Sequence, residues 1–146
     1  MKIIISACLF GENCKYNGGN NYDEALAALL AGQQILRVCP EAAGGLPAPR
    51  PPADLVNGIV INREGVSVDE EFRRGAAECM EAAKAFHPDL AILKSRSPSC
   101  GCRTIYDGTF SGTLIPGKGI FAAQLEASGV RVFSEEDIDE IKVFLK

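Results

Sequence analysis

Three of the six cysteines stand in short segments that contain glycine or proline and that could converge on one site. Cys8 lies in "SACLFGENC", Cys39 in "VCPE" and Cys100 in "SPSCGC". Proline fixes the backbone beside a thiol, and glycine lets the backbone approach a bulky group closely. Thiolates that meet repel one another unless a metal ion or a cluster neutralises them. We therefore take these three cysteines as candidate metal or cluster ligands.

The spacing of the cysteines favours iron–sulfur chemistry over zinc. Structural zinc sites use four ligands, commonly as C-x₂-C pairs, and this sequence has no such pair. An iron–sulfur cluster is held by cysteine thiolates, and a set of three leaves one iron open to a substrate. Cys79, in the helical stretch "AAECMEAAKAF", is expected to be a buried apolar side chain. Cys14 and Cys102 are left open between a structural and a functional role.

Composition favours one globular domain over residues 1–146, with enough apolar residues (47%) to fold without disulfide bonds. A net charge of −4 gives no electrostatic reason to expect a nucleic acid or membrane partner. The apolar run in "MKIIISACLFGEN" is too short for a signal peptide, and no segment is long enough to span a bilayer. We therefore expect a cytoplasmic protein, and the sequence carries no signal of its oligomeric state.

Apolar runs and chain-breaking residues predict alternating strands and helices. The predicted strands cover residues 2–6, 34–39, 89–93 and 130–133, and the predicted helices cover residues 22–31, 69–86, 120–127 and 135–145. A loop is expected over residues 40–52, a β-hairpin over 59–69 that turns at 62–65, and short strands over 104–106 and 110–114. Asp69 and Ser134 are the expected N-caps of two helices.

This alternation predicts an α/β fold, namely a Rossmann-like three-layer sandwich with a mainly parallel four-stranded sheet and a small β-hairpin insertion. In such a sheet, ligands bind beyond the carboxyl ends of the strands. Cys8 lies two residues beyond the first predicted strand, Cys39 ends the second, and Cys100 lies in the loop after the third. The predicted topology therefore brings the three thiols to one crevice.

Three motifs, in order along the chain, resemble the 2-thiouracil desulfidase family of small bacterial iron–sulfur proteins. They are "SACLFGENCKYNGG", "CPEAAGGLPAPRPPADL" and "KSRSPSCG" followed by "IYDGTFSGTLIPGKGI". The resemblance runs from Ile5 to about Ala122. It implies an oxygen-sensitive [4Fe–4S] cluster bound by Cys8, Cys39 and Cys100.

The same resemblance implies an enzyme that hydrolyses a small thiolated pyrimidine, 2-thiouracil, to uracil and hydrogen sulfide. The thiocarbonyl sulfur is expected to bind the one iron that has no protein ligand. Glu41, the acid of the "CPE" motif, is the expected acid–base group that assists the attack of water. A serine should share the proton handling: Ser97 and Ser99 are both candidates, and Ser95 stays open as a third.

Other residues near the motifs carry weaker expectations. Arg50 and Lys94 are candidates for contacting pyrimidine oxygens or balancing thiolate charge, although either could equally be a solvated surface charge. The stretch "GTLIPGKG" lacks the Ser or Thr of a P-loop. We expect it to line the rim of the pocket, with helix amides facing an anionic group. His87, just before a proline, is expected to cap a helix end.

A second class of function must be weighed against the enzyme. Cys100 and Cys102 are one residue apart, so they could form a regulatory disulfide or bind a metal ion. The protein would then be a non-catalytic metal-binding or redox-sensing module.

Overall fold

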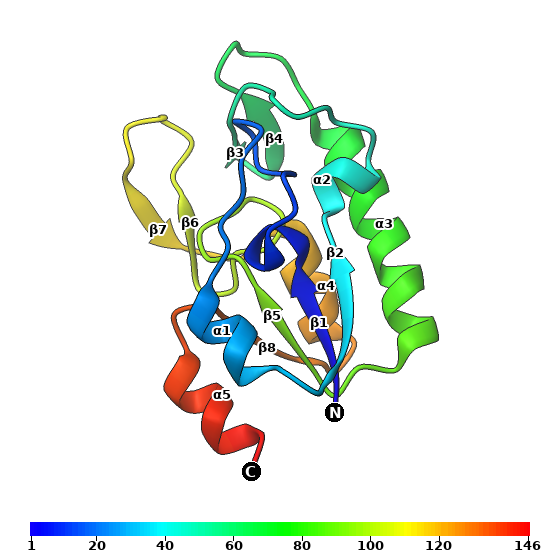
Figure 1. Ribbon diagram of the computed structural model, residues 1–146. Coiled ribbons are helices and arrows are strands. Elements are labelled where there is room, and N and C mark those ends of the chain that lie inside the picture. The colour runs from blue at the N-terminus through cyan, green and yellow to red at the C-terminus, as the bar shows by residue number, and fades with distance from the viewer.

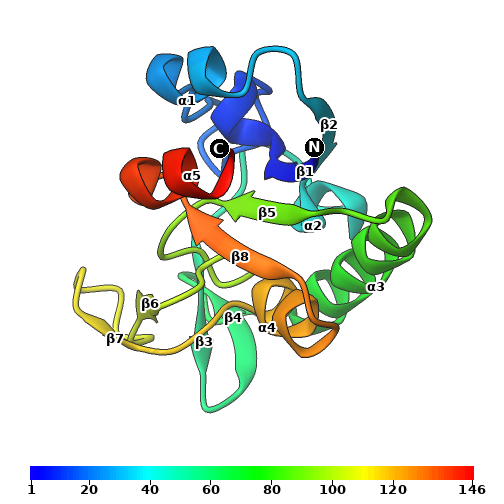
Figure 2. The same ribbon diagram turned by 90° about the horizontal axis from the view of Figure 1, so that it is seen from below.

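The computed structural model describes residues 1–146, and it has three layers (Figure 1). The middle layer is a parallel four-stranded sheet with the strand order β2-β1-β5-β8. The strands span Gln34–Val38 (β2), Lys2–Ser6 (β1), Leu90–Leu93 (β5) and Arg131–Ser134 (β8). Helices α1 (Glu24–Leu29) and α5 (Ile138–Phe144) cover one face of the sheet, while α3 (Asp69–Phe86) and α4 (Ile120–Ala127) cover the other (Figure 2). The predicted three-layer α/β sandwich is confirmed.

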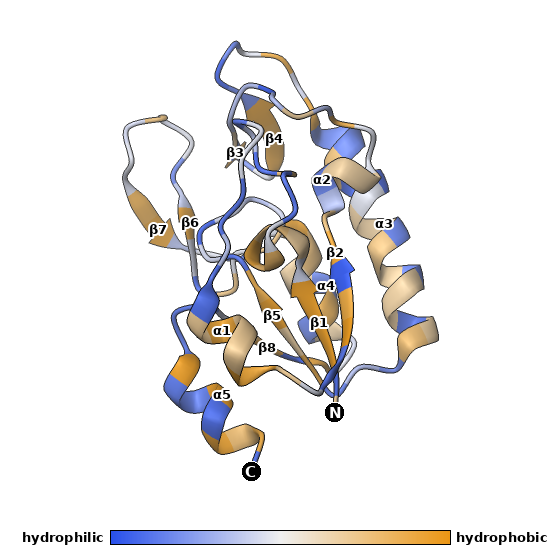
Figure 3. Ribbon diagram, viewed as in Figure 1, coloured by the Kyte–Doolittle hydropathy of each residue, from blue (hydrophilic) through white to orange (hydrophobic).

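The central strands β1 and β5 are apolar on both faces, because helices cover both (Figure 3). Successive side chains of a strand point to opposite faces. Ile3 and Ile5 therefore pack into the core beneath α1 and α5, and Ile4 packs into the core beneath α3 and α4. Continuous apolar runs of this kind are typical of parallel strands buried on both sides. None of the helices has the length and apolar character that a membrane crossing requires.

Four predicted elements have the predicted bounds: β1, α3, α4 and the short strand β6 (Thr104–Tyr106). The partner of β6 is β7 (Leu114–Pro116), so the strand predicted over residues 110–114 was placed too early. Helix α5 begins at Ile138 and not at residue 135. The reason is local: the Ser134 N–H donates to Asp137 Oδ2 and Ser134 Oγ accepts from the Glu136 N–H, which makes a turn before the helix.

The hairpin prediction had the wrong strand partner. Strand β4 (Ile59–Asn62) pairs antiparallel with the preceding β3 (Ala53–Val56), and the predicted pairing across residues 62–65 is reduced to one isolated bridge. The turn is Asn57–Gly58, whose φ angles of 52° and 81° are both positive. Asn-Gly is a strong signal for this type of hairpin turn. The hairpin is inserted before α3, as expected.

Two further predictions at helix ends were wrong. The loop predicted over residues 40–52 begins with a one-turn helix, α2 (Pro40–Ala43), because proline is well suited to the first position of a helix. Asp69 is the first residue of α3 and not its N-cap, which is Val68. The Asp69 carboxylate instead accepts the N–H of Val60 in β4 at 3.0 Å. His87 occupies the C-cap of α3 with a left-handed φ of 55°, as predicted for a helix end.

Helices α2 and α3 approach each other so closely that only glycine fits between them. A Cβ atom on Gly75 of α3 would lie 1.7 Å from the Pro40 carbonyl oxygen, and one on Gly44 would lie 1.9 Å from the Glu71 carbonyl oxygen. These atoms are backbone atoms, so they cannot move aside as a flexible side chain would. The contact therefore sets the position of α2, and with it the position of Cys39 and Glu41.

Substitution of Gly75 by Ala should destabilise the protein, although Gly to Ala within a helix ordinarily stabilises by about 1 kcal/mol. Overpacking of the α2–α3 contact should outweigh that gain, for a net loss of about 1–3 kcal/mol in the free energy of unfolding. Urea unfolding measures this change. Ala77→Ser, on the exposed side of the same helix, is the control and should change stability by less than about 0.5 kcal/mol. A stabilised Gly75→Ala protein would contradict the close contact.

Candidate active site

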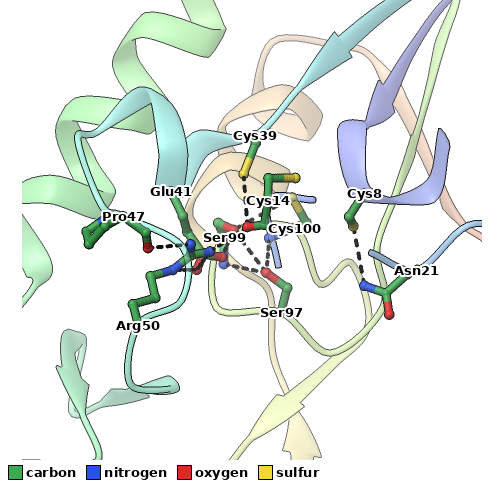
Figure 4. A network of polar contacts seen from close by, with 10 residues as sticks. All are labelled: Cys8, Cys14, Asn21, Cys39, Glu41, Pro47, Arg50, Ser97, Ser99 and Cys100. Atoms are coloured by element: carbon green, nitrogen blue, oxygen red, sulfur yellow. Dashed lines mark hydrogen bonds and ion pairs between the residues drawn. The ribbon is translucent and has the colours of Figure 1, made fainter. Parts of the chain in front are cut away.

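The three sequence-predicted cysteines line one cavity of about 550 Å³ beyond the carboxyl ends of β1, β2 and β5 (Figure 4). Cys8 lies in a 3₁₀ turn (Ala7–Phe10) that follows β1 directly. Cys39 follows β2 and is the N-cap of α2. Cys100 lies in the loop after β5. The topology therefore brings the thiols together as their positions after three parallel strands predicted.

Cys14 also lines the cavity, next to two of the predicted ligands, Cys8 and Cys39. A hydrogen bond with Cys14 is the main cause that lowers the pKa of Cys8 from 9.0 to about 7, and Asn21 contributes through its Nδ2–H, 3.4 Å from the Cys8 sulfur. Hydrogen bonding with Cys14 also lowers the pKa of Cys39, as does the Ala42 N–H at the start of α2. Cys14 itself keeps its proton, since these contacts raise its pKa far above the usual range.

Cys100 is held by the N-terminus of α4. The first amides of that helix donate to the loop, from Ile120 N–H to the Pro98 oxygen and from Phe121 N–H to the Ser99 oxygen, both at 2.9 Å. A Cβ atom on Gly119 would lie only 2.4 Å from the Ser99 carbonyl carbon, so glycine is needed there. The prediction that these amides face an anionic group was wrong, because they are used to fix the cysteine loop. Of the stretch 112–119, Gly112 alone lines the cavity.

Burial separates Cys100 from the other two predicted ligands. The residue is 4% exposed, and burial raises the pKa of its thiol. Its sulfur lies 3.7 Å from the Ser99 hydroxyl. A buried thiol in such a place loses its proton readily only when a positive charge, such as that of a metal, stands beside it.

Glu41 lies beside Cys100 in a network of directed hydrogen bonds (Figure 4). Its Oε1 accepts from Arg50, at 2.9 Å from Nη2 and 3.3 Å from Nε. Its Oε2 accepts from the Ser99 hydroxyl at 3.0 Å. The Ser99 hydroxyl in turn lies 2.9 Å from the Ser97 hydroxyl. The carboxylate, two hydroxyls and the Cys100 sulfur therefore form one connected group.

The three candidate serines have different surroundings. Ser99 contacts Glu41 directly but is only 1% exposed. Ser97 is partly exposed, and its hydroxyl also accepts the backbone N–H groups of Ser99 and Cys100. Ser95 belongs to a separate group, in which its hydroxyl donates to Glu135.

Lys94 is neither a free surface charge nor a free donor. Its Nζ lies 2.8 Å from Glu135 Oε2 and 3.1 Å from the Ser95 hydroxyl. Lys94 lines the cavity, and its positive charge contributes to the lowered pKa of Cys8. The ion pair with Glu135 occupies this side chain, and Glu135 opposes the effect of Lys94 on the pKa of Cys8.

Three aromatic side chains also line the cavity, and sequence reasoning missed them. They are Tyr16, Tyr106 and Phe110. Phe110 has a left-handed φ of 58°, and its backbone N–H donates to the buried Asp54. The Arg63 guanidinium lies 5.7 Å from the centre of the Phe110 ring. Asn21 was missed as well, because the stretch around it has the composition of an ordinary loop.

Cys79 and Cys102 are not among the residues that line the cavity. Both are buried in the apolar core between the sheet and helices α3 and α4. Burial raises the pKa of Cys79 to about 12 and also raises that of Cys102. Cys79 is the buried apolar side chain that the sequence predicted. Cys102 shares no site with Cys100, although it is only two residues away.

The donor set suits a cofactor with several metal atoms. No group of three or more His, Cys, Asp or Glu side chains surrounds one point closely enough to hold a single metal ion. A zinc ion requires all its sulfur ligands at about 2.3 Å from one centre. In an iron–sulfur cluster each cysteine binds a different iron, so the ligating sulfurs stand further apart. Three thiols around a roomy cavity fit that second arrangement.

Comparison with known proteins identifies a family of desulfurases, and the match covers nearly the whole chain. A family model described as 2-thiouracil desulfurase matches residues 3–137. The chain belongs to the 2-thiouracil desulfurase family. A family relative from Bacillus subtilis (strain 168), the uncharacterized protein YbbK, is 38% identical over 149 residues, covering 95% of this chain and 99% of the relative.

A solved structure resembles this desulfurase-family chain closely. It is described as the [4Fe–4S]-dependent thiouracil desulfidase TudS. The two share 42% sequence identity and a TM-score of 0.91, over 99% of this chain and 97% of the other. The predicted family is confirmed.

Alkylation of the metal-free, reduced protein should distinguish the cavity thiols from the core thiols. Cys8 should react first with iodoacetamide, because its lowered pKa of about 7 supplies thiolate at neutral pH. Its reaction should slow as the pH falls below 7, since protonation removes the thiolate. Cys79 and Cys102 should react only after unfolding in urea, which serves as the control in which all six cysteines are labelled. Mass spectrometry of peptides gives the order, and rapid native labelling of Cys79 would contradict its burial.

Proposed function

We propose that the protein converts a thiolated pyrimidine, with 2-thiouracil as the reference substrate, to uracil and hydrogen sulfide, using a [4Fe–4S] cluster held by Cys8, Cys39 and Cys100. The observation that carries the proposal is the convergence of these thiols on one cavity, beside the Glu41–Ser99 hydrogen bond. When bound, such a cluster would supply a soft, electron-withdrawing iron. A soft iron site of this kind binds a thiocarbonyl sulfur in preference to a hard oxygen donor. Family membership and the TudS likeness support the same activity.

The protein's own part in the reaction is the movement of protons. Replacing a C=S bond by C=O with one water leaves both protons of that water on the departing sulfur. A group near the cluster must therefore accept a proton and return it. Glu41 suits this role, since its Oε2 faces Ser99 while Oε1 is bound by Arg50. We assign Ser99 as the link and Ser97, the more exposed hydroxyl, as the end that faces the cavity.

The remaining walls suit a small, flat heterocycle. Tyr16, Tyr106 and Phe110 line the cavity, and aromatic rings stack readily on planar rings. The volume of about 550 Å³ lies within the range of small-molecule sites. We also propose the cytoplasm as the location, because all six cysteines are free and ligand thiolates persist where thiols are kept reduced.

The alternative of a non-catalytic module based on Cys100 and Cys102 has little support. Cys100 lines the cavity and Cys102 does not. A joint metal site or a regulatory disulfide would need both thiols to face the same space.

The ligand set can be tested by iron content. Cys100→Ser should lose nearly all iron after anaerobic reconstitution, because a hydroxyl is a hard and poor ligand for this metal. Cys102→Ser is the matched control and should keep the iron content and the brown colour of the unchanged protein. Iron and acid-labile sulfide analysis, beside the visible absorption, measures the outcome. Loss of iron in Cys102→Ser would show that the second cysteine of "SPSCGC" is the ligand.

The reaction and the role of Glu41 can be tested together. The reconstituted protein should release sulfide and uracil in equal amounts from 2-thiouracil under anaerobic conditions. Glu41→Gln should keep its iron but lose about 10²–10⁴-fold in turnover, since an amide cannot accept a proton. If Glu41→Gln stays fully active, Glu41 is not the acid–base group. If the unchanged protein releases no sulfide from a panel of thiolated bases and nucleosides, the proposed function is wrong.

A further inference from the structure

Arg50 makes more contacts around the cavity than an ion pair requires. Its guanidinium is bonded to Glu41 Oε1 through Nη2 and Nε. Nη2 also donates to the Cys14 carbonyl oxygen at 2.9 Å, and Nη1 donates to the Pro47 carbonyl oxygen at 3.0 Å. The backbone N–H of Arg50 donates to the Tyr16 carbonyl oxygen at 2.6 Å. One residue therefore joins three chain segments at the wall of the site.

This geometry disfavours the role for Arg50 in which it contacts the substrate. Its side chain is 7% exposed, and four of its five guanidinium N–H bonds are directed at protein oxygens. Arg50 can therefore influence the reaction through the position of Glu41, to which it donates two hydrogen bonds.

The surroundings explain why Glu41 needs a partner to hold it. A second cavity of about 150 Å³ adjoins the pair, since both Glu41 and Arg50 line it as well as the first. Leu46 and Phe72 contribute apolar surface there. Without the guanidinium, the Glu41 side chain has space to rotate away from Ser99. With it, Oε1 is fixed on two N–H groups, and Oε2 is left directed at the Ser99 hydroxyl.

We propose that Arg50 is a positioning residue that orients Glu41 for proton transfer while binding no substrate itself. The inference rests on the proposed function, in which Glu41 moves the proton. It also requires arginine in particular. A planar guanidinium reaches a carboxylate and two carbonyl groups at fixed angles, whereas a lysine ammonium is a single point with flexible reach.

A double-mutant cycle on the reconstituted, iron-loaded protein tests the proposal. Arg50→Gln should lower kcat about 10²-fold, the effect expected from misplacing a catalytic group by about 1 Å. Its KM for 2-thiouracil should stay within about twofold, because no substrate contact is lost. In the Glu41→Gln background, Arg50→Gln should cause less than about a twofold further loss, since residues that act through one group are non-additive. Arg73→Gln, which removes an exposed ion pair on α3, is the control and should leave kcat unchanged.

Chemical rescue adds a measurement that a purely structural role would not change. Arg50→Ala leaves space for a free guanidinium ion, and millimolar guanidinium should restore part of kcat in Arg50→Ala but none in Arg50→Ala/Glu41→Gln. The kcat of Arg50→Lys should be lower than the kcat of Arg50→Ala in the presence of guanidinium.

Each other outcome overturns the proposal for a distinct reason. If Arg50→Gln lowers kcat by the same factor in the wild-type and the Glu41→Gln backgrounds, Arg50 acts on the substrate directly. Wild-type kcat in Arg50→Gln would mean that Glu41 needs no positioning. Loss of iron in Arg50→Lys, Arg50→Gln and Arg50→Ala alike would make Arg50 a structural tie of the Cys14 segment. Full activity of Glu41→Gln alone would instead refute the proposed role of Glu41, before Arg50 is considered.

Discussion

Parallel pairing of β1 with both β2 and β5 is the constraint on which the site depends. In this register Ser6 lies opposite Val38, and Ile5 lies opposite Ile92. The three strands therefore end at nearly the same level, and the chain turns into the loops that carry the thiols. A slip of one residue would move a thiol by about 3.3 Å and exchange the faces of the strand. Apolar packing on both faces resists such a slip.

Close backbone contacts between helices and loops determine where the loops beyond the sheet lie. Gly75 lets α2 lie against α3, which determines where Cys39 and Glu41 stand. Gly119 lets the start of α4 meet the loop of Cys100, whose carbonyl groups accept the first amides of that helix. Both contacts are between backbone atoms, which are stiffer than side chains. The positions of Cys39 and Cys100, which we propose as cluster ligands, are consequently set by the fold itself.

The ion pair between Glu41 and Arg50 fixes the polar groups of the site in one arrangement, but burying the two charges costs stability. Removing Glu41 and Arg50 from water is expensive, and their mutual attraction seldom exceeds that cost by much. Here the additional hydrogen bonds to the Cys14 and Pro47 carbonyl groups satisfy the guanidinium, and no buried polar side-chain atom of the protein is left without a partner. A fully satisfied network of this kind specifies one arrangement of its members. It leaves the carboxylate directed at Ser99, next to the Cys100 sulfur.

Local patterns predicted those parts of the molecule that depend on neighbours in the chain. The apolar run of β1, the long helix α3 and the helix α4 were predicted with their bounds, because each is specified by its own periodicity and stop signals. The position of cysteines after three strands was enough to predict their convergence. The weaker predictions were at places where a turn competes with a strand or helix, as at Asn57–Gly58 and before α5.

By itself, the sequence determined the family, the α/β fold and the three thiols that meet. Only the tertiary structure decided that Cys14 faces the cavity while Cys102 is buried in the core. It also decided that Ser99 is the serine that contacts Glu41. Residues in loops have no periodicity that directs their side chains. Their directions follow from which segments the sheet register and the helix contacts bring together, and those segments are far apart in the chain.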